Sequence, residues 1–398
     1  MKKLFCMLLS LVLVLGATAG LAESTPVTLK FAAQGDSTPA TQAVIDAFNA
    51  SQTDYVVEWV DMTNDSGAMR EQLTTALKAG STEYDILSLD VVWAGEFAAS
   101  GYIQPIDMMM DDAGLNPDDY NAGSMASGYY NGKQYVLPFF PDLGLLYYRS
   151  DIVSEEDAAK LIAGDYTFAD LQAMSETYKG QEGTTAGFVY QSSLYEGLVC
   201  NANEFTANWT DIKGGLQAMK AMADSAATPD NILTYTEGET ANSFVKGESV
   251  FARNWPYMWG MIASEGTITQ DQVGTAPLPG GDTVGGWLLA ISKTSENPEG
   301  AFEFMKFLNS YDGQVIMATQ GGYLPGVNEY LDDETVVGQD DRFAMEGFQN
   351  ALKNTIARPV SAEYSKVSDE LQQAIYAYLS GSADIDATVT AVEAALAE

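Results

Sequence analysis

The sequence predicts an α/β protein built of two lobes, each with its own sheet. Strand-like and helix-like segments alternate through the first 90 residues, with short polar links between them. This alternation is typical of doubly wound sheets. The chain has 398 residues, whereas a single hydrophobic core rarely grows beyond about 250–300 residues. Length and alternation together indicate two such units.

The first lobe begins with three strands and two helices. Apolar runs of strand length occupy residues 27–33, 55–60 and 84–90. Pro39, which follows the possible helix caps Ser37 and Thr38, is expected in the first turn of a helix between the first two strands. A four-residue spacing of apolar side chains predicts a helix over 66–80 that ends at a glycine.

The segment 132–151 is predicted to cross between the lobes, with Pro138 and Pro141 bracketing a turn before a strand LGLLYYR. A capped helix is expected from Thr167 and another from Asn297. Further predicted strands are 187–191, 249–255 and 283–293; further helices are 192–205, 212–226 and most of 341–398. No internal repeat is present, so several chain crossings should join the lobes. The predicted lobes are 25–141 with 289–340, and 142–288 with 341–398.

The N-terminal segment 1–22 has the pattern of a secretory signal peptide. Lys2 and Lys3 precede an apolar run, and small residues follow it up to a cut predicted after Ala22. A membrane anchor is the alternative, but the run is shorter than the roughly 20 residues a spanning helix needs. Cys6 lies inside the run rather than directly after it, so a lipid anchor is not supported. We expect an exported protein, periplasmic or on the extracellular face of the membrane.

Charge and composition exclude several functions. The formal net charge is −36, or −38 once the two lysines of the signal peptide are removed. No basic cluster is present to neutralise phosphates, so nucleic-acid binding is excluded. The chain has no histidine, and Cys200 is its one cysteine outside the signal peptide. Histidine-based catalysis and imidazole zinc sites are therefore absent. Cys200 is expected to be a buried structural thiol.

Two loops of the predicted first sheet are candidates for a ligand crevice, because in open α/β sheets such a crevice lies beyond the carboxyl ends of the strands. Gln34, Gly35 and Asp36 follow the first strand, and Asp90 ends the third. Asp36 has an alternative role as a cap of the following helix. Asp142, in a loop between prolines and an apolar strand, is a further candidate.

The stretch RNWPYMWG, residues 253–260, concentrates aromatic rings on a backbone that Pro256 prevents from being an ordinary central strand. Either a core patch or a platform for a flat, partly apolar ligand explains it. We favour ligand contact for Trp255 and for Trp287, which lie beside Pro256 and a Gly-Gly pair respectively. Core packing is favoured for Trp59, Trp209 and Trp259.

Several stretches resemble one known family. They are SLDVVWAGEFAASGYIQPID, GKQYVLPFFPDLGLLYYRSD, GFVYQSSLYEGLVCN, FARNWPYMWG, VGTAPLPGG, VGGWLLAISK and ARPVSAEYSKVS. The chain resembles the extracellular sugar-binding proteins of ABC importers and is most similar to their trehalose/maltose-binding branch. The resemblance implies two α/β lobes joined by a hinge of two or three strands, with a ligand cleft between them. It also implies a protein that is not an enzyme, which closes on a sugar and delivers it to membrane permease subunits.

The resemblance further implies roles for particular residues. Asp90 and Asp142 would accept hydrogen bonds from sugar hydroxyls, and Arg70 and Arg358 would donate them. The remaining implied contacts are the stacking rings of Trp255, Tyr257 and Trp287, the backbone of Gly286, and the weaker candidates Tyr195 and Glu196. The family often carries a carboxylate after the first strand; here Gln34, Gly35 and Asp36 share that place, which leaves the contact open.

Two other functions remain as alternatives. A secreted polysaccharide hydrolase would need two carboxylates about 5–10 Å apart, which Asp90 and Asp142 could supply, although nothing in the sequence indicates a raised pKa beside them. A binding protein for another ligand, such as a polyamine, would suit the acidity but would need more acids at the aromatic positions. No cofactor or metal is expected, and the protein is expected to be a monomer.

Overall fold

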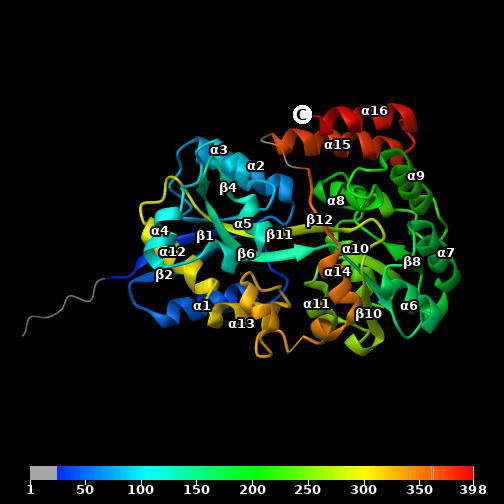
Figure 1. Ribbon diagram of the computed structural model, residues 1–398, viewed down its shortest axis with the longest axis horizontal. Helices are drawn as coiled ribbons and strands as arrows, with labels where there is room; N and C mark the ends of the chain where they lie inside the picture. Colours follow the sequence, from blue (N-terminus) through cyan, green and yellow to red (C-terminus); the bar gives the residue numbers. More distant parts are fainter. Residues whose placement is uncertain (1–24, 339, 360, 362, 398) are drawn as a thin grey trace, which may run out of the picture.

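The computed structural model describes residues 25–338, 340–359, 361 and 363–397. Two sheets lie side by side, each flanked by helices (Figure 1), which confirms the predicted α/β class. The predicted signal peptide, 1–22, lies outside the described residues. Within the described part of the chain, no helix combines the length and the apolar character needed to span a bilayer.

The first sheet has six strands and belongs to what we call the N-lobe. Its strands are β1 (Val27–Gln34), β2 (Tyr55–Met62), β3 (Ile86–Asp90), β6 (Val136–Leu143), β11 (Asp282–Ile291) and β12 (Thr355–Ile356). Strand β1 runs parallel to β2 and β3, and β11 runs antiparallel to β3 and β6. The helices of this lobe are α1 (Ala40–Ser51), α2 (Ser66–Lys78), α3 (Ala94–Ala99), α4 (Asp107–Ala113), α5 (Ala122–Ser127), α12 (Pro298–Leu308) and α13 (Tyr311–Gly321). A small hairpin of β4 (Tyr129–Tyr130) and β5 (Lys133–Gln134) stands apart from the sheet.

The second sheet, of the C-lobe, has the order β10-β7-β9-β8. Its strands are β7 (Leu145–Arg149), β8 (Ala186–Val189), β9 (Ser249–Asn254) and β10 (Val273–Ala276). The surrounding helices are α6 (Glu155–Ala163), α7 (Phe168–Tyr178), α8 (Glu196–Phe205), α9 (Ile212–Ala223), α10 (Glu237–Val245), α11 (Met258–Glu265), α14 (Glu346–Lys353), α15 (Tyr364–Leu379) and α16 (Ile385–Leu396). Helices α15 and α16 pack together at the top of this lobe in Figure 1.

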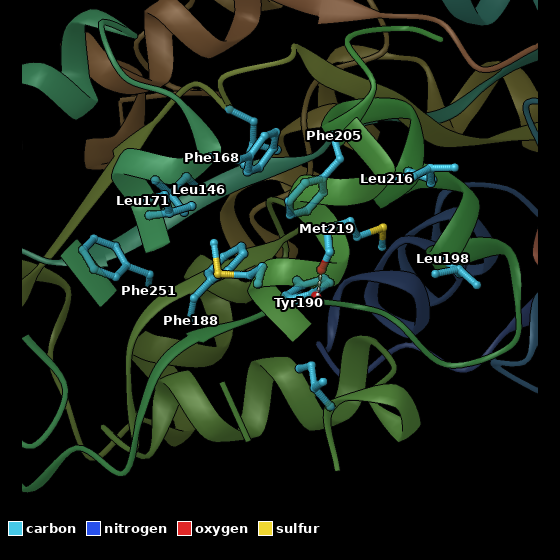
Figure 2. Packing of buried hydrophobic residues seen from close by; sticks show 14 of the residues in the cluster. Leu146, Phe168, Leu171, Phe188, Tyr190, Leu198, Phe205, Leu216, Met219 and Phe251 are labelled. Atoms are coloured by element: carbon cyan, nitrogen blue, oxygen red, sulfur yellow. Dashed lines mark hydrogen bonds between the residues drawn. The ribbon is translucent and has the colours of Figure 1, made fainter. Parts of the chain in front are cut away.

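An aromatic core holds the C-lobe helices against their sheet. Phe168 of α7 and Phe205 of α8 stack with ring centroids 3.7 Å apart. The ring centroid of Tyr190 lies 5.8 Å from that of Phe205 (Figure 2). The capping box predicted at the start of α7 is confirmed, because Thr167 accepts from the Asp170 amide and Asp170 accepts from Thr167. The burial of these rings positions α8, whose first residues line the cavity described below.

Two long strands connect the lobes. Strand β6 continues through Gly144 into β7 of the other sheet, and β11 runs beside β6 along most of its length. The predicted turn at Pro138 and Pro141 is wrong, because both prolines lie inside β6. Among the described strands, β6 pairs with β11 alone, and such an edge position tolerates residues that cannot donate to a ladder. Two of the proposed lobe boundaries, 141/142 and 288/289, fall within β6 and β11; these two and the third, 340/341, stay predictions.

Candidate functional site

A cavity of about 620 Å³ lies between the two sheets and is lined by residues of both lobes. Its volume is within the range of about 300–1,000 Å³ that is usual for small-molecule sites. Nine of the eleven predicted site residues line it: Asp90, Asp142, Tyr195, Glu196, Trp255, Tyr257, Gly286, Trp287 and Arg358. Asp36 and Arg70 do not. The residues that line this cavity without having been predicted include Phe140, Leu194, Glu237 and Tyr323.

Asp36 caps a helix instead of lining the cavity. Its carboxylate accepts hydrogen bonds from the amides and hydroxyls of Thr38 and Thr41, at 2.6–3.1 Å, and from the hydroxyl of Tyr323 at 2.7 Å. These bonds occupy its oxygens and fix the first turn of α1. Asp36 therefore has the capping role that was the alternative, and Gln34 and Gly35 line the cavity where Asp36 does not. A ligand contact at Asp36 stays a prediction that the structure does not support.

An ion-pair network joins the lobes on one wall of the cavity. Arg358, just after β12, donates from Nη2 to Oδ1 of Asp90 at 2.6 Å and from Nη1 to Oε1 of Glu196 at 2.9 Å. Asp90 ends β3 of the N-lobe, whereas Glu196 begins α8 of the C-lobe. The Nε of Arg358 is buried and has no hydrogen-bond partner in the described structure. A buried donor of this kind needs a partner, which a ligand hydroxyl in the cavity can provide.

Asp142, at the end of β6, is a carboxyl group whose pKa is displaced upward. Burial raises its pKa to about 8, against the lowering effects of the Leu143 amide, which donates to it at 3.0 Å, and of Arg253 and Arg342. No local pattern around Asp142 indicated such a shift. A protonated carboxyl group can donate one hydrogen bond and accept others. Asp142 can therefore donate to the oxygen of a ligand hydroxyl or accept a hydrogen bond from it.

The indole of Trp255 is held at the cavity by three neighbours. Strand β9 ends at Asn254 and α11 begins at Met258, so Trp255 lies on the irregular backbone that was predicted. The guanidinium carbon of Arg253 lies 4.0 Å from the ring centroid, a cation–π distance. Glu237 accepts from the indole Nε1 at 3.4 Å. A Cβ atom at Gly285 would lie only 2.6 Å from the ring, so glycine is needed beside it.

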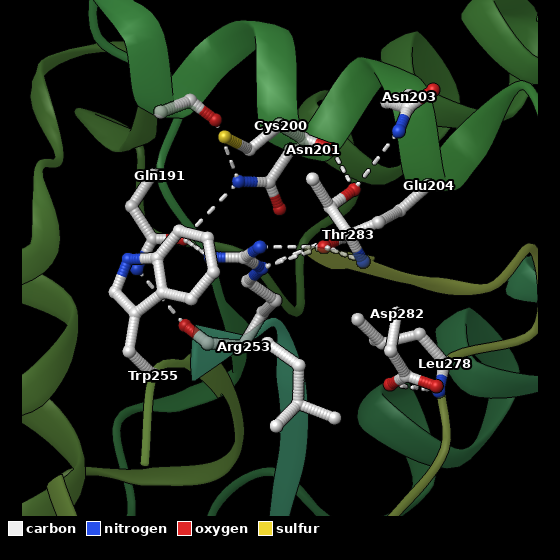
Figure 3. A network of polar contacts seen from close by, with 12 residues as sticks. Gln191, Cys200, Asn201, Asn203, Glu204, Arg253, Trp255, Leu278, Asp282 and Thr283 are labelled. Carbon is white, nitrogen blue, oxygen red and sulfur yellow. Dashed lines mark hydrogen bonds and ion pairs between the residues drawn. The ribbon is translucent and has the colours of Figure 1, made fainter. Parts of the chain in front are cut away.

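Arg253 is itself fixed by a buried network (Figure 3). It is fully buried and forms an ion pair with Glu204, with Nη2 and Oε1 2.5 Å apart. Its Nη1 also donates to Oε1 of Gln191 at 3.3 Å. A charge pair that is both paired and hydrogen-bonded persists in a low-dielectric interior. The network therefore holds the guanidinium of Arg253 in a fixed position against the Trp255 ring.

Trp287 belongs to β11 and presents its ring from the N-lobe. It pairs across the sheet with Asp90 and Phe140 and packs edge-on against Trp93, with ring centroids 5.4 Å apart. Gly286 has φ +110°, and a Cβ there would lie 2.6 Å from the carbonyl oxygen of Phe140. The backbone itself thus requires glycine at position 286, where the resemblance implies close approach of a ligand.

Glu237 is the site residue that sequence reasoning missed most clearly. It accepts from the hydroxyl of Tyr195 at 2.6 Å as well as from the indole of Trp255, and so ties two predicted site residues together. It begins α10, a helix that we did not predict. The available signal was the capping box Thr236-x-x-Glu239, which the structure shows at the start of this helix.

The remaining residues discussed in the sequence analysis lie either in the core or in a second cavity. Trp259 is 3% exposed and packs in the C-lobe core, as predicted, and Cys200 is buried. Arg70 forms an ion pair with Glu96 and lines a second, adjoining cavity. Among the described residues, no cluster of three or more histidine, cysteine, aspartate or glutamate side chains is arranged to hold a metal ion.

Comparison with known proteins establishes the family. The model of the bacterial extracellular solute-binding protein family matches residues 34–315, and the chain belongs to this family. A probable ABC transporter-binding protein of Deinococcus radiodurans is 28% identical over 92% of this chain and 93% of its own. A maltotriose-binding protein of Pyrococcus abyssi is 25% identical over 71% of this chain and 63% of its own.

Solved structures agree with this assignment. Maltose-bound T. maritima MalE3 is 29% identical and superposes with a TM-score of 0.83, covering 93% of this chain and 99% of that chain. The family resemblance expected from the sequence is confirmed. Members of the family are exported substrate-binding proteins and not enzymes, so the hydrolase alternative for Asp90 and Asp142 is set aside.

Proposed function

We propose that this protein is the receptor of an ABC importer for an α-linked gluco-disaccharide or oligosaccharide of the trehalose/maltose type. The observation that carries the proposal is the lining of the large cavity. Aromatic rings enter it from both lobes, Trp255 from one and Trp287 from the other, and ionisable groups stand between them. A sugar has apolar C–H faces and a rim of hydroxyls, so it needs both kinds of partner.

The proposed contacts follow from the chemistry of each group. Trp255, Tyr257 and Trp287 stack on the faces of the rings. Asp90 and Asp142 accept from hydroxyls, Arg358 donates to oxygens, and Tyr195 and Glu196 complete the C-lobe wall; all of these residues line the cavity. Hydrogen bonds to charged partners contribute about 1.5–3 kcal/mol each. The relatives named for maltose and maltotriose support this ligand class.

The wider setting is part of the same proposal. A signal peptide directs export, the lobes close on the sugar about β6 and β11, and the closed monomer docks on the permease subunits. Contacts from both lobes to one ligand favour this closing motion, because the ligand then binds the closed form better than the open one.

Thermal-shift and calorimetric screening of the mature chain tests the ligand class. The panel consists of trehalose, maltose, sucrose and maltotriose, with glucose and spermidine for comparison. We expect at least one α-glucoside to raise the midpoint of thermal unfolding by several degrees, because a ligand that binds only the folded state stabilises it. A folded sample that responds to none of the sugars would contradict the proposal, as would a response to spermidine alone.

Glu237 provides a test of how the cavity wall is organised. Glu237→Ala removes the acceptor shared by Tyr195 and Trp255, and we expect about tenfold weaker sugar binding with little change in unfolding temperature. Glu237→Gln keeps one acceptor oxygen for the Tyr195 hydroxyl and should recover part of the loss. Glu265→Ala, at an exposed position at the end of α11, is the control. Equal affinities for all three variants and the wild type would show that Glu237 positions neither ring.

A further inference from the structure

A further connection between the lobes, besides β6 and β11, follows α13 of the N-lobe and leads into α14 of the C-lobe. Val336 clusters with Ala318 of α13, on the N-lobe side. The ring of Phe343 lies against that of Phe348 of α14, with ring centroids 5.3 Å apart. Arg342 lies between these contacts and is fully buried. A buried guanidinium therefore occupies the junction of the two lobes.

The guanidinium of Arg342 donates hydrogen bonds to backbone carbonyl groups of both lobes. Its Nη1 donates to the carbonyl oxygen of Pro256, between β9 and α11 of the C-lobe. Its Nη2 donates at 2.7 Å to the carbonyl oxygen of Gly322, which directly follows α13 of the N-lobe. Asp340 accepts from Nε at 3.0 Å and balances the charge. Because arginine presents its donors in a rigid planar fork, the two carbonyl groups are held at a fixed separation.

Both carbonyl groups belong to loops that line the large cavity. One loop carries Trp255 and Tyr257 on either side of its proline, and the other continues directly into Tyr323. All three aromatic residues line the cavity. Arg342 lines neither of the two cavities that the described residues form. It can therefore act on a bound molecule only through the loops that it holds.

The lobes are in contact where these two loops meet. A Cβ atom at Gly260, in the first turn of α11, would lie 3.4 Å from the carbonyl oxygen of Gly321, the last residue of α13. Gly322 has φ +65°, a backbone conformation that favours glycine. Tyr147 adds a second donor to the C-lobe loop, because its hydroxyl lies 3.3 Å from the carbonyl oxygen of Pro256. Packing this close leaves little room for one loop to move independently of the other.

We infer that Arg342 is a positioning residue for ligand binding, which fixes Trp255 and Tyr257 of the C-lobe relative to Tyr323 of the N-lobe. The inference rests on the proposed function, because Trp255 and Tyr257 are proposed ligand contacts. A binding site requires its contacting side chains to be held within about 0.5 Å of the productive geometry by the residues behind them. Loss of the guanidinium therefore loosens both loops and weakens binding, although the ligand does not touch Arg342.

Arg342→Lys in the mature chain tests the inference. Lysine keeps a positive charge beside Asp340, but its ammonium group cannot reproduce the planar fork that reaches both carbonyl groups. Without sugar, we expect the backbone amides of segments 255–261 and 321–326 to exchange hydrogen about tenfold faster than in the wild type, while the rest of the chain exchanges at the wild-type rate. Calorimetric titration should show about tenfold weaker binding of maltose.

Arg149→Lys is the matched control. Arg149 is also buried, and its guanidinium pairs with an aspartate two residues away, Asp151, at 2.6 and 2.7 Å. It lines neither cavity, so Arg149→Lys should bind maltose and exchange in both segments like the wild type. If Arg342→Lys does not fold, Asp340→Asn with Arg342→Met takes its place with the same expected results. Proteins tolerate the loss of both members of a buried ion pair better than the loss of one.

Wild-type exchange rates in either segment of the Arg342 variant overturn the inference, as does an increase spread evenly over the whole chain. Unchanged maltose affinity in the Arg342 variant overturns it too, and so does an equal loss of affinity in Arg149→Lys. If the wild type does not bind maltose, the exchange rates alone decide whether Arg342 positions the loops. The proposed function itself fails only if the entire sugar panel gives no response.

Discussion

Replacement of Trp255 by alanine is expected to weaken sugar binding at least 100-fold while the protein stays folded. An aromatic side chain buries about 150–250 Å², and apolar area contributes about 25 cal/mol per Å². Covering even half of that area with a sugar gives roughly 2–3 kcal/mol. The loss of the stacking contact between the indole and the sugar ring adds to this. Calorimetry with the best sugar of the panel measures the affinity, and circular dichroism confirms the fold.

Trp259, four residues further along, provides the matched control. It is 3% exposed within the C-lobe core, so Trp259→Ala should lower the free energy of unfolding by about 3–5 kcal/mol. The two variants separate a ring that faces a cavity from a ring that fills a core. If Trp255→Ala unfolds the protein as readily as Trp259→Ala does, then Trp255 is a core residue and its proposed role is wrong. Trp287→Ala should behave like Trp255→Ala.

Asp142 is expected to make the stability of the empty protein depend on pH. The ordinary pKa of an aspartate in an unfolded chain is about 3.9, and burial raises the pKa of Asp142 to about 8 in the folded state. The folded state therefore holds a proton that the unfolded state has released between these values. The stabilisation is fully present below about pH 4 and is lost as the pH rises toward 8. Its upper limit is about 6 kcal/mol for a shift of about four pKa units.

Denaturant unfolding of the wild type and of Asp142→Asn at pH 4 to 8 measures this contribution. Asparagine cannot release a proton, so the difference in unfolding free energy between the two proteins should change steadily over that range, in favour of Asp142→Asn at high pH. Glu196 and Glu204 also have raised pKa values through burial, but they are present in both proteins and cancel in the difference. Parallel stability curves would contradict a raised pKa at Asp142.

Much of the fold followed from local patterns in the sequence. The strand–helix alternation predicted β1, α1, β2, α2 and β3 to within about two residues, because each apolar run is bounded by polar or turn-forming residues. Strand β6 was missed because its two prolines argue locally against a strand. The prolines are accommodated because β6 pairs with β11 on one side. This pairing is a feature of the tertiary structure and leaves no signal in the local sequence.

The site residues also fall into those with a local sequence signal and those that depend on distant contacts. Asp90 could be placed because it ends a buried strand, and Trp255 because a proline follows it. Asp36 could not be assigned, since its bonds to Thr38 and Thr41 are local but its bond to Tyr323 comes from a residue 287 positions away. The pKa of Asp142 likewise depends on burial between two sheets, which no stretch of sequence encodes by itself.

The pairing of Arg358 with Asp90 has a consequence for which molecules can enter. Asp90 ends β3 and Arg358 follows β12 of the same sheet, and these two groups neutralise each other, so a ligand that separates them must replace both partners at once. A molecule with only acceptor atoms would satisfy the guanidinium and strand the carboxylate, and one with only donors would do the reverse. A vicinal diol both donates and accepts hydrogen bonds, so it can substitute for both members of the ion pair. We therefore expect the protein to select polyols over ethers, ketones and amines.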